Sequence, residues 1–263
     1  MRGATIPTLR DCVYGQAVAD ALGVPYEFRP RGSFLCTDMV GHGSHNKPAG
    51  TWSDDTSMAL AICDSYRELG RIDVNDIRAR FVRWYREGAY TVDGLFDVGN
   101  ATREALERGH GLAGERDNGN GSLMRTVPLA FTDATDDEVR AVSAVTHAHP
   151  TAMEACVAMV RIARDLIAGA SPADVAGDVA ARPAGDIRSG GFVLDTFDAA
   201  LWCLANTSSY AECALTAVNL GDDTDTTAAV AGALAGIVYG IEGIPSEWLD
   251  KLRGKDVIEA CLF

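Results

Sequence analysis

The sequence is poor in basic residues and has no long apolar run. Its 263 residues include 23 lysines and arginines against 37 aspartates and glutamates, which gives a formal net charge of −14. This negative charge argues against a protein that binds nucleic acid by neutralising phosphates. It leaves room for a nucleotide-like ligand, because bound cations would reverse the local field. No apolar stretch reaches about eighteen residues, so a membrane span is not expected.

Closely spaced cysteine pairs and a secretory signal are also missing. The seven cysteines are an odd number, widely separated, and none forms a Cys-x-x-Cys pair. A disulfide scaffold is therefore not expected, and most thiols stand in apolar stretches where they pack as small hydrophobic groups. The first thirty residues contain no basic segment followed by an apolar run. We expect a cytoplasmic monomer that binds neither nucleic acid nor membranes.

Alternating patterns typical of β-strands are nearly absent, and apolar residues recur at helical spacing instead. The predicted helices cover residues 12–22, 57–69, 74–84, 101–108, 137–146, 152–168, 172–179, 196–205, 210–220, 226–239 and 247–252. The helix at 226–239 is rich in alanine and glycine, which predicts close packing at the centre of the fold. No linker or repeat divides the chain, so we predict one compact all-α domain spanning residues 1–263.

Three long segments separate these helices, at 29–51, 90–100 and 109–121. Loops of this length in a compact domain are usually functional or mobile.

Two acidic clusters each stand directly before an apolar helix. The first acidic cluster, residues 52–58, contains Asp54 and Asp55; the second, residues 222–227, contains Asp222, Asp223 and Asp225. Buried carboxylates cost several kcal/mol each unless a cation neutralises them. The two clusters together therefore suggest one shared site for divalent metal ions.

A helix cap and a calcium loop are the two other interpretations of the clusters. Aspartate and threonine are good helix N-caps, but a cap needs a single side chain and the second cluster supplies three carboxylates. A calcium loop would place a glutamate at its twelfth position, where counting from Asp223 gives Leu234. Neither cluster contains histidine or cysteine, and oxygen ligands alone favour hard cations over zinc.

Five motifs resemble those of the ADP-ribosylglycohydrolase family and occur in that family's order. They lie at 15–28, 50–58, 119–129, 146–147 and 222–239. A shorter motif at 97–103 resembles the branch typified by the dinitrogenase-reductase-activating glycohydrolase, which removes ADP-ribose from arginine. The resemblance implies a compact orthogonal helical bundle and a dinuclear Mg²⁺ or Mn²⁺ centre that binds ADP-ribose.

By position, the resemblance implies six metal ligands. These are Ser53, Asp54, Asp55, Asp223, Asp225 and Thr226. Ser53 stands where the family commonly has threonine, and it keeps the ligating oxygen. Asp222 stands where the family often has glycine, and we expect it to point away as a cap or an outer acceptor.

The same resemblance implies a substrate-binding set: Gly119, Asn120, Gly121, Ser122, Met124 and His147. The segment 119–122 could present several backbone N–H groups to a pyrophosphate or ribose, although an ordinary Asn-Gly turn is the alternative. His147 is expected to contact the adenosine side, with a helix C-cap as the alternative. Arg125 could reach a phosphate or pair with a structural aspartate.

Three carboxylates are the candidate catalytic residues. Asp55 would hold or activate the attacking water, Asp97 would meet a guanidinium leaving group, and Glu27 would gate the site beside the metals. For Asp97 the alternative is a cap of the helix that follows, and for Glu27 a surface acid. The expected function is release of ADP-ribose from an ADP-ribosylated protein, most directly from arginine. Rival functions are hydrolysis of serine-linked ADP-ribose or its esters, binding without turnover, and metal-dependent phosphate hydrolysis.

Overall fold

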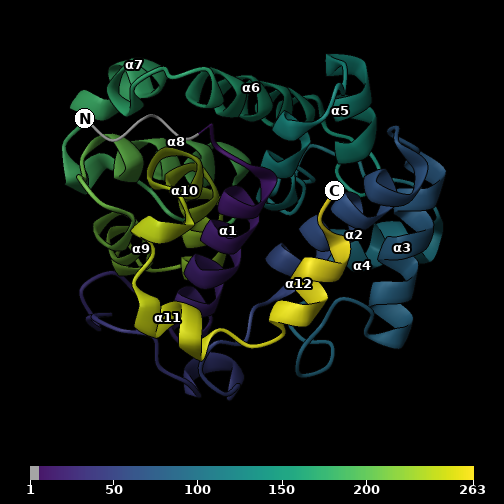
Figure 1. The fold of residues 1–263 in the computed structure, drawn as a ribbon. Helices are drawn as coiled ribbons and strands as arrows, with labels where there is room; N and C mark the ends of the chain where they lie inside the picture. Colours follow the sequence, from purple (N-terminus) through teal and green to yellow (C-terminus); the bar gives the residue numbers. More distant parts are fainter. Residues whose placement is uncertain (1–5) are drawn as a thin grey trace.

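The computed structural model describes residues 6–263, which form helices and loops (Figure 1). The α-helices are α1 (Leu9–Gly23), α2 (Asp54–Leu69), α3 (Val74–Glu87), α4 (Asn100–Arg108), α5 (Asp136–Ser143), α6 (Pro150–Ile167), α7 (Pro172–Ala176), α8 (Val193–Ala205), α9 (Tyr210–Asn219), α10 (Thr224–Tyr239), α11 (Ser246–Lys251) and α12 (Lys255–Cys261). Short 3₁₀ turns are η1 (Val24–Tyr26), η2 (Gly43–His45), η3 (Leu123–Arg125), η4 (Val127–Phe131), η5 (Gly177–Ala181), η6 (Ala184–Asp186) and η7 (Ile241–Gly243). Within residues 6–263 no strand forms, only isolated bridges, so the predicted all-α class is confirmed.

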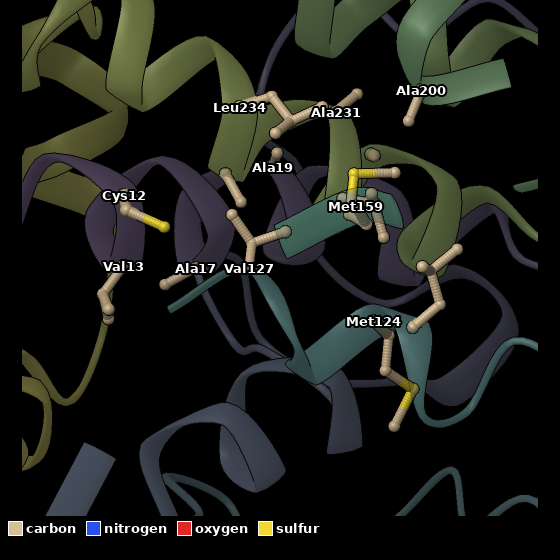
Figure 2. Packing of buried hydrophobic residues seen from close by; sticks show 14 of the residues in the cluster. Cys12, Val13, Ala17, Ala19, Met124, Val127, Met159, Ala200, Ala231 and Leu234 are labelled. Atoms are coloured by element: carbon tan, nitrogen blue, oxygen red, sulfur yellow. The ribbon is translucent and has the colours of Figure 1, made fainter. Parts of the chain in front are cut away.

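The centre of the fold is the pair α1 and α10, which pack along their length (Figure 1). A Cβ atom on Gly15 would lie only 2.3 Å from the Gly232 carbonyl oxygen, and one on Gly232 would lie 2.3 Å from the Ala19 Cβ. Such short distances mean that the two backbones touch where side chains would normally stand between them. Figure 2 shows Ala19 of α1 on the side of the helix toward α10, where Ala231 and Leu234 lie. The close packing predicted from the alanine and glycine content is therefore observed.

The remaining helices surround this pair. Helices α8 and α9 pack against α10, α2 packs against both α1 and α3, and α5 lies against α6 (Figure 1). The last helix, α12, packs on α2 and was not predicted from the sequence. The predicted helices otherwise correspond to observed ones, with ends that differ by a few residues.

The structure agrees with the sequence-based expectations about disulfides and membrane-spanning helices. All seven cysteines are buried and unpaired, so no disulfide forms. Across residues 6–263 the helices are too short or too polar to cross a lipid bilayer.

Two contacts bring the starts of α2 and α10 together at the end of α1. A Cβ on Gly23, the last residue of α1, would lie 2.4 Å from the Cα of Asp225. On the other side, Asp20 accepts hydrogen bonds from the backbone N–H groups of Ser53 and Thr56, at 2.9 and 3.1 Å. Asp20 is thus a buried brace between α1 and the first acidic cluster. Both acidic clusters therefore meet at one end of the central helix pair.

Candidate metal and substrate site

The first acidic cluster forms the start of α2. Ser53 is the N-cap, and its Oγ accepts a hydrogen bond from the Asp55 backbone N–H at 3.3 Å. Because Ser53 supplies the cap, neither Asp54 nor Asp55 is needed for that purpose. Both aspartates are nevertheless buried, with 6% and 0% of their surface exposed. Capping alone therefore does not account for this cluster.

The second acidic cluster forms the start of α10. Asp223 occupies the N-cap position, yet its side chain makes no capping hydrogen bond. Its Oδ2 instead accepts a hydrogen bond from the Asn120 side-chain amide at 2.8 Å. Asp225 is completely buried, whereas Asp222 is exposed and lies outside the buried set. Capping therefore does not account for the second acidic cluster either.

The two clusters are in direct contact. Thr226 Oγ1 donates to Asp55 Oδ2 at 3.3 Å, and Ser53 Oγ donates to the same oxygen at 3.0 Å. The Thr226 backbone N–H also donates to Asp225 Oδ1 at 3.0 Å. Residues from two distant parts of the sequence thus share one small buried region.

Three buried carboxylate oxygens in this region lack a hydrogen-bond partner: Asp55 Oδ1, Asp223 Oδ1 and Asp225 Oδ2. Unpartnered buried oxygens are costly, and a bound cation is one way to satisfy them. Burial raises the pKa of Asp54, Asp55, Asp223 and Asp225, and repulsion from neighbouring carboxylates raises each pKa further. Carboxylate and hydroxyl oxygens are the ligands that Mg²⁺ and Mn²⁺ prefer. The residues present therefore fit a divalent metal centre.

A cavity of about 200 Å³ opens above the two clusters. Its wall comes from several loops and helix starts: Glu27, Asp54, Asp97, Gly99, Asn100, Ala101, Thr102, Gly119, Asn120, Gly121, Met124, His147, Asp223 and Thr226. Most of the sequence-predicted site residues line it, while Ser53, Asp55 and Asp225 are buried residues of the two clusters that do not line it. Ser122 does not line the cavity either, and it belongs to neither cluster. Its hydroxyl is fully buried against Ser143 at 2.9 Å and is not part of the cavity wall.

A group of three carboxylates and one histidine lies beside the cavity, and two of its members, Glu27 and Asp97, line the wall. The carboxylate oxygens of Glu27, Asp97 and Asp225 and a ring nitrogen of His45 all lie within 4.8 Å of one another. Burial raises the pKa of Glu27 to about 7, against the opposing effect of its bond to His45. That same bond raises the pKa of His45. Glu27 is only 6% exposed, so the alternative of a surface acid is wrong.

Asp97 lies in a strained loop conformation. Its φ is +50°, a region that few non-glycine residues adopt. The N-cap of α4 is Gly99 and receives no side-chain cap, so Asp97 does not cap that helix. Its half-buried carboxylate is left at the cavity wall.

In the segment 119–122, not every backbone N–H group is free to bind a ligand. The Asn120 N–H donates to the Gly191 carbonyl at 3.0 Å and is therefore used within the protein. The Asn120 side chain donates to both Thr196 Oγ1 and Asp223 Oδ2, at 2.8 Å each. Asn120 thus links this wall of the cavity to the second acidic cluster.

His147 lies beneath the two glycines of this segment. A Cβ on Gly121 would lie 2.7 Å from the His147 ring, so only glycine fits there. Burial lowers the pKa of His147 to about 3, which keeps the ring neutral. Its Nδ1 lies 2.8 Å from Thr146 Oγ1.

Arg125 fits neither of the two roles considered for it. It is fully buried, and it donates to the Gly121 carbonyl and to Thr146 Oγ1 at 2.8 Å each. Burial lowers its pKa to about 10. Arg125 therefore supports Gly121 and Thr146 from behind and does not itself line the cavity.

Sequence reasoning missed two residues that shape the site. Asp20 is the one ionisable residue in the small apolar stretch 17–23 of α1, and that contrast was a signal for it. His45 stands in a long loop with no local pattern, and only the folded chain brings it to Glu27.

Comparison with known proteins adds four findings. The ADP-ribosylglycohydrolase family model matches residues 4–262. The chain is 38% identical to an ADP-ribosylarginine hydrolase Tri1 of Serratia proteamaculans, over 92% of this chain and 74% of that protein. It is 33% identical to the ADP-ribosyl-[dinitrogen reductase] glycohydrolase of Rhodospirillum rubrum, over 92% and 88% of the two chains. A solved structure described as an ADP-ribosylglycohydrolase-related protein complex superposes with a TM-score of 0.83 and 33% identity, covering 96% of this chain and 94% of the other.

Proposed function

Because the chain belongs to the ADP-ribosylglycohydrolase family, we propose that it is a metal-dependent hydrolase that removes ADP-ribose from arginine side chains of modified proteins. The Tri1 relative is named for ADP-ribosylarginine and the other relative for a modified dinitrogen reductase. The first name supports an arginine-linked substrate, and the second supports a modified protein as the substrate. The reaction breaks the bond between the anomeric carbon of the ribose and the guanidinium nitrogen. The water oxygen joins that carbon, and a proton goes to the nitrogen, which releases ADP-ribose and intact arginine.

The metal-holding residues would be Ser53, Asp54, Asp55, Asp223, Asp225 and Thr226. Two Mg²⁺ or Mn²⁺ ions would supply positive charge that holds the ribose hydroxyls and polarises a water molecule. The observation that carries the proposal is the set of three unpartnered buried oxygens on Asp55, Asp223 and Asp225. These oxygens come from two clusters that touch through Thr226 and Asp55.

Asp97 is the residue we assign to the arginine. A carboxylate matches the planar guanidinium fork in charge and geometry. Asp97 borders the cavity without being one of the six proposed ligands, and its strained backbone fixes the carboxylate at the wall. It would bind the leaving group while the clusters below hold the ribose.

Asp55 and Glu27 are the remaining catalytic candidates. Ser53 and Thr226 orient Asp55 through its Oδ2, and the carboxylate would hold the attacking water beside the metal ions. Glu27 borders the cavity on the side of Asp97, where its carboxylate would gate the site. Gly119, Asn120, Gly121, Met124 and His147 would form the wall along which the rest of ADP-ribose lies.

The test compares two substrates that differ only in linkage. The protein and Mg²⁺ are incubated with arginine-linked and serine-linked ADP-ribosyl peptides, and free ADP-ribose is measured. Release from the arginine peptide alone supports the proposal. Release from the serine peptide alone assigns the other linkage, and binding of ADP-ribose without release from either assigns a binding protein.

A further inference from the structure

Glu27 faces the cavity although its neighbours repel it. Its carboxylate lies close to those of Asp97 and Asp225, and the charges of Asp97 and Asp223 disfavour its ionised form. A glutamate side chain has three rotatable bonds, so repulsion alone would turn it outward. The only contact of opposite charge recorded for Glu27 among residues 6–263 is His45, whose Nε2 is hydrogen-bonded to Glu27 Oε2.

The backbone around His45 is anchored on the segment that carries Glu27. Ser44 Oγ donates to the Glu27 carbonyl at 2.6 Å. Gly43 has φ +59°, and a Cβ there would lie 2.0 Å from the Pro25 carbonyl oxygen. His42 and Asn46 also adopt positive φ values, of +69° and +51°. Because the turn is strained and packs directly on the segment 25–27, the backbone of His45 has little conformational freedom.

The His45 ring is held from two sides as well. Its centroid lies 5.9 Å from that of Phe28 and 5.2 Å from that of Phe96. Phe28 is adjacent to Glu27, and Phe96 is adjacent to Asp97. The Lys47 ammonium lies 4.8 Å from the Phe96 ring centroid and helps to hold that ring. His45 is therefore packed between the two loops that carry the candidate catalytic acids.

We propose that His45 is a positioning residue that holds the Glu27 carboxylate in the cavity, facing Asp97 and the metal-binding clusters. The inference rests on the proposed function, in which Glu27 is a catalytic candidate that gates the site. A purely structural ion pair would tie the loop down and affect stability. A positioning role instead makes turnover depend on the donor that His45 offers to Glu27.

The experiment uses four test variants, one control variant and two readouts. His45→Leu removes the donor, whereas His45→Gln keeps an N–H at a similar reach. Glu27→Gln and the double variant Glu27→Gln/His45→Leu test whether the two side chains act together, and His110→Leu, at an exposed histidine outside the cavity, is the control. Kinetics on an arginine-linked substrate give kcat and KM, and crystal structures with and without ADP-ribose give the Glu27 rotamer.

The expected result is a kcat for His45→Leu that falls about 10- to 100-fold, as for other residues that orient a catalytic group, with KM nearly unchanged. His45→Gln recovers most of that loss, and the double variant is no slower than Glu27→Gln. In the His45→Leu crystals Glu27 turns out of the cavity. Unchanged kcat in His45→Leu, or an equal further loss in the double variant, overturns the inference. If the wild type cleaves no arginine linkage, the proposed function fails separately. The crystals still decide the positioning role, because an unmoved Glu27 overturns it.

Discussion

The last residue of α1, Gly23, touches the backbone of Asp225 at the start of α10. A Cβ on Gly23 would lie 2.4 Å from the Asp225 Cα and 2.6 Å from the Thr224 carbonyl oxygen. Because backbone atoms cannot step aside as a flexible side chain can, this contact sets how deeply the second acidic cluster is buried.

Gly23→Ala should therefore damage both stability and metal binding. We expect a loss of unfolding free energy of at least about 1–3 kcal/mol, the usual cost of overpacking, and a weaker thermal response to Mg²⁺. Gly185→Ala is the control, because a Cβ there meets nothing within 4 Å. Denaturant unfolding of both variants measures the difference. Equal stabilities would show that the contact can relax.

Divalent metal should stabilise the folded protein. A ligand at one hundred times its Kd adds about 2.7 kcal/mol to the free energy of unfolding, so Mg²⁺ should raise the Tm. Asp223→Asn should reduce this rise, because it removes one carboxylate charge from the shared region. The exposed neighbour Asp222 gives a matched control, and Asp222→Asn should respond as the wild type does. A wild-type melting curve that ignores Mg²⁺ would argue strongly against a buried metal site.

Mutations of Asp97 and Asp55 should have different effects, because Asp97 is assigned to the arginine and Asp55 to the metal ions. Asp97→Asn keeps the size of the side chain, and asparagine tolerates the positive φ at this position. We expect arginine turnover to fall by about 100-fold or more, while calorimetric binding of ADP-ribose changes little. Asp55→Asn should impair both, because Asp55 belongs to the metal-binding set. Near-normal turnover in Asp97→Asn would remove its assigned role.

His147 should make the folded protein less stable as the pH falls. Its folded pKa is lowered to about 3, whereas an unfolded histidine titrates near its ordinary value of 6.5. Between these values the unfolded chain binds the extra proton, so the free energy of unfolding falls with decreasing pH. From pH 7 to pH 5 the neutral ring should cost about 2 kcal/mol. The carboxylates with raised pKa values shift stability in the opposite direction, but they do so in both proteins. Denaturant unfolding at both pH values should therefore show a change in the wild type that is about 2 kcal/mol less favourable than the change in His147→Gln. The same pH dependence in both would contradict a neutral buried ring.

Much of the fold could be predicted because its signals are local. The alanine and glycine content of 226–239 predicted a closely packed central helix, and α10 is that helix. Helix α12 was missed because its seven residues are too short for a clear period and pack on α2 only in the folded chain. The position of Asp54, Asp55, Asp223 and Asp225 together was foreseeable, since clustered carboxylates before apolar helices are costly without a partner.

The contacts between distant loops could not be predicted in the same way. Nothing in the segment 42–47 indicates that His45 reaches Glu27, since the contact depends on how Gly43 and Ser44 seat on the turn at Pro25. The Asn120 N–H was expected to be free for a ligand, but Gly191, which is remote in sequence, accepts it. Such pairings are set by tertiary packing and leave no periodic trace.

The central claim is that the two acidic clusters hold divalent metal ions required to release ADP-ribose from arginine. The most direct test measures free ADP-ribose released from an arginine-linked substrate by the chelated protein and again after stepwise addition of Mg²⁺ or Mn²⁺. The account predicts no release in chelator and a saturable return of turnover as metal is added. Full turnover in the metal-free, chelated protein would contradict it.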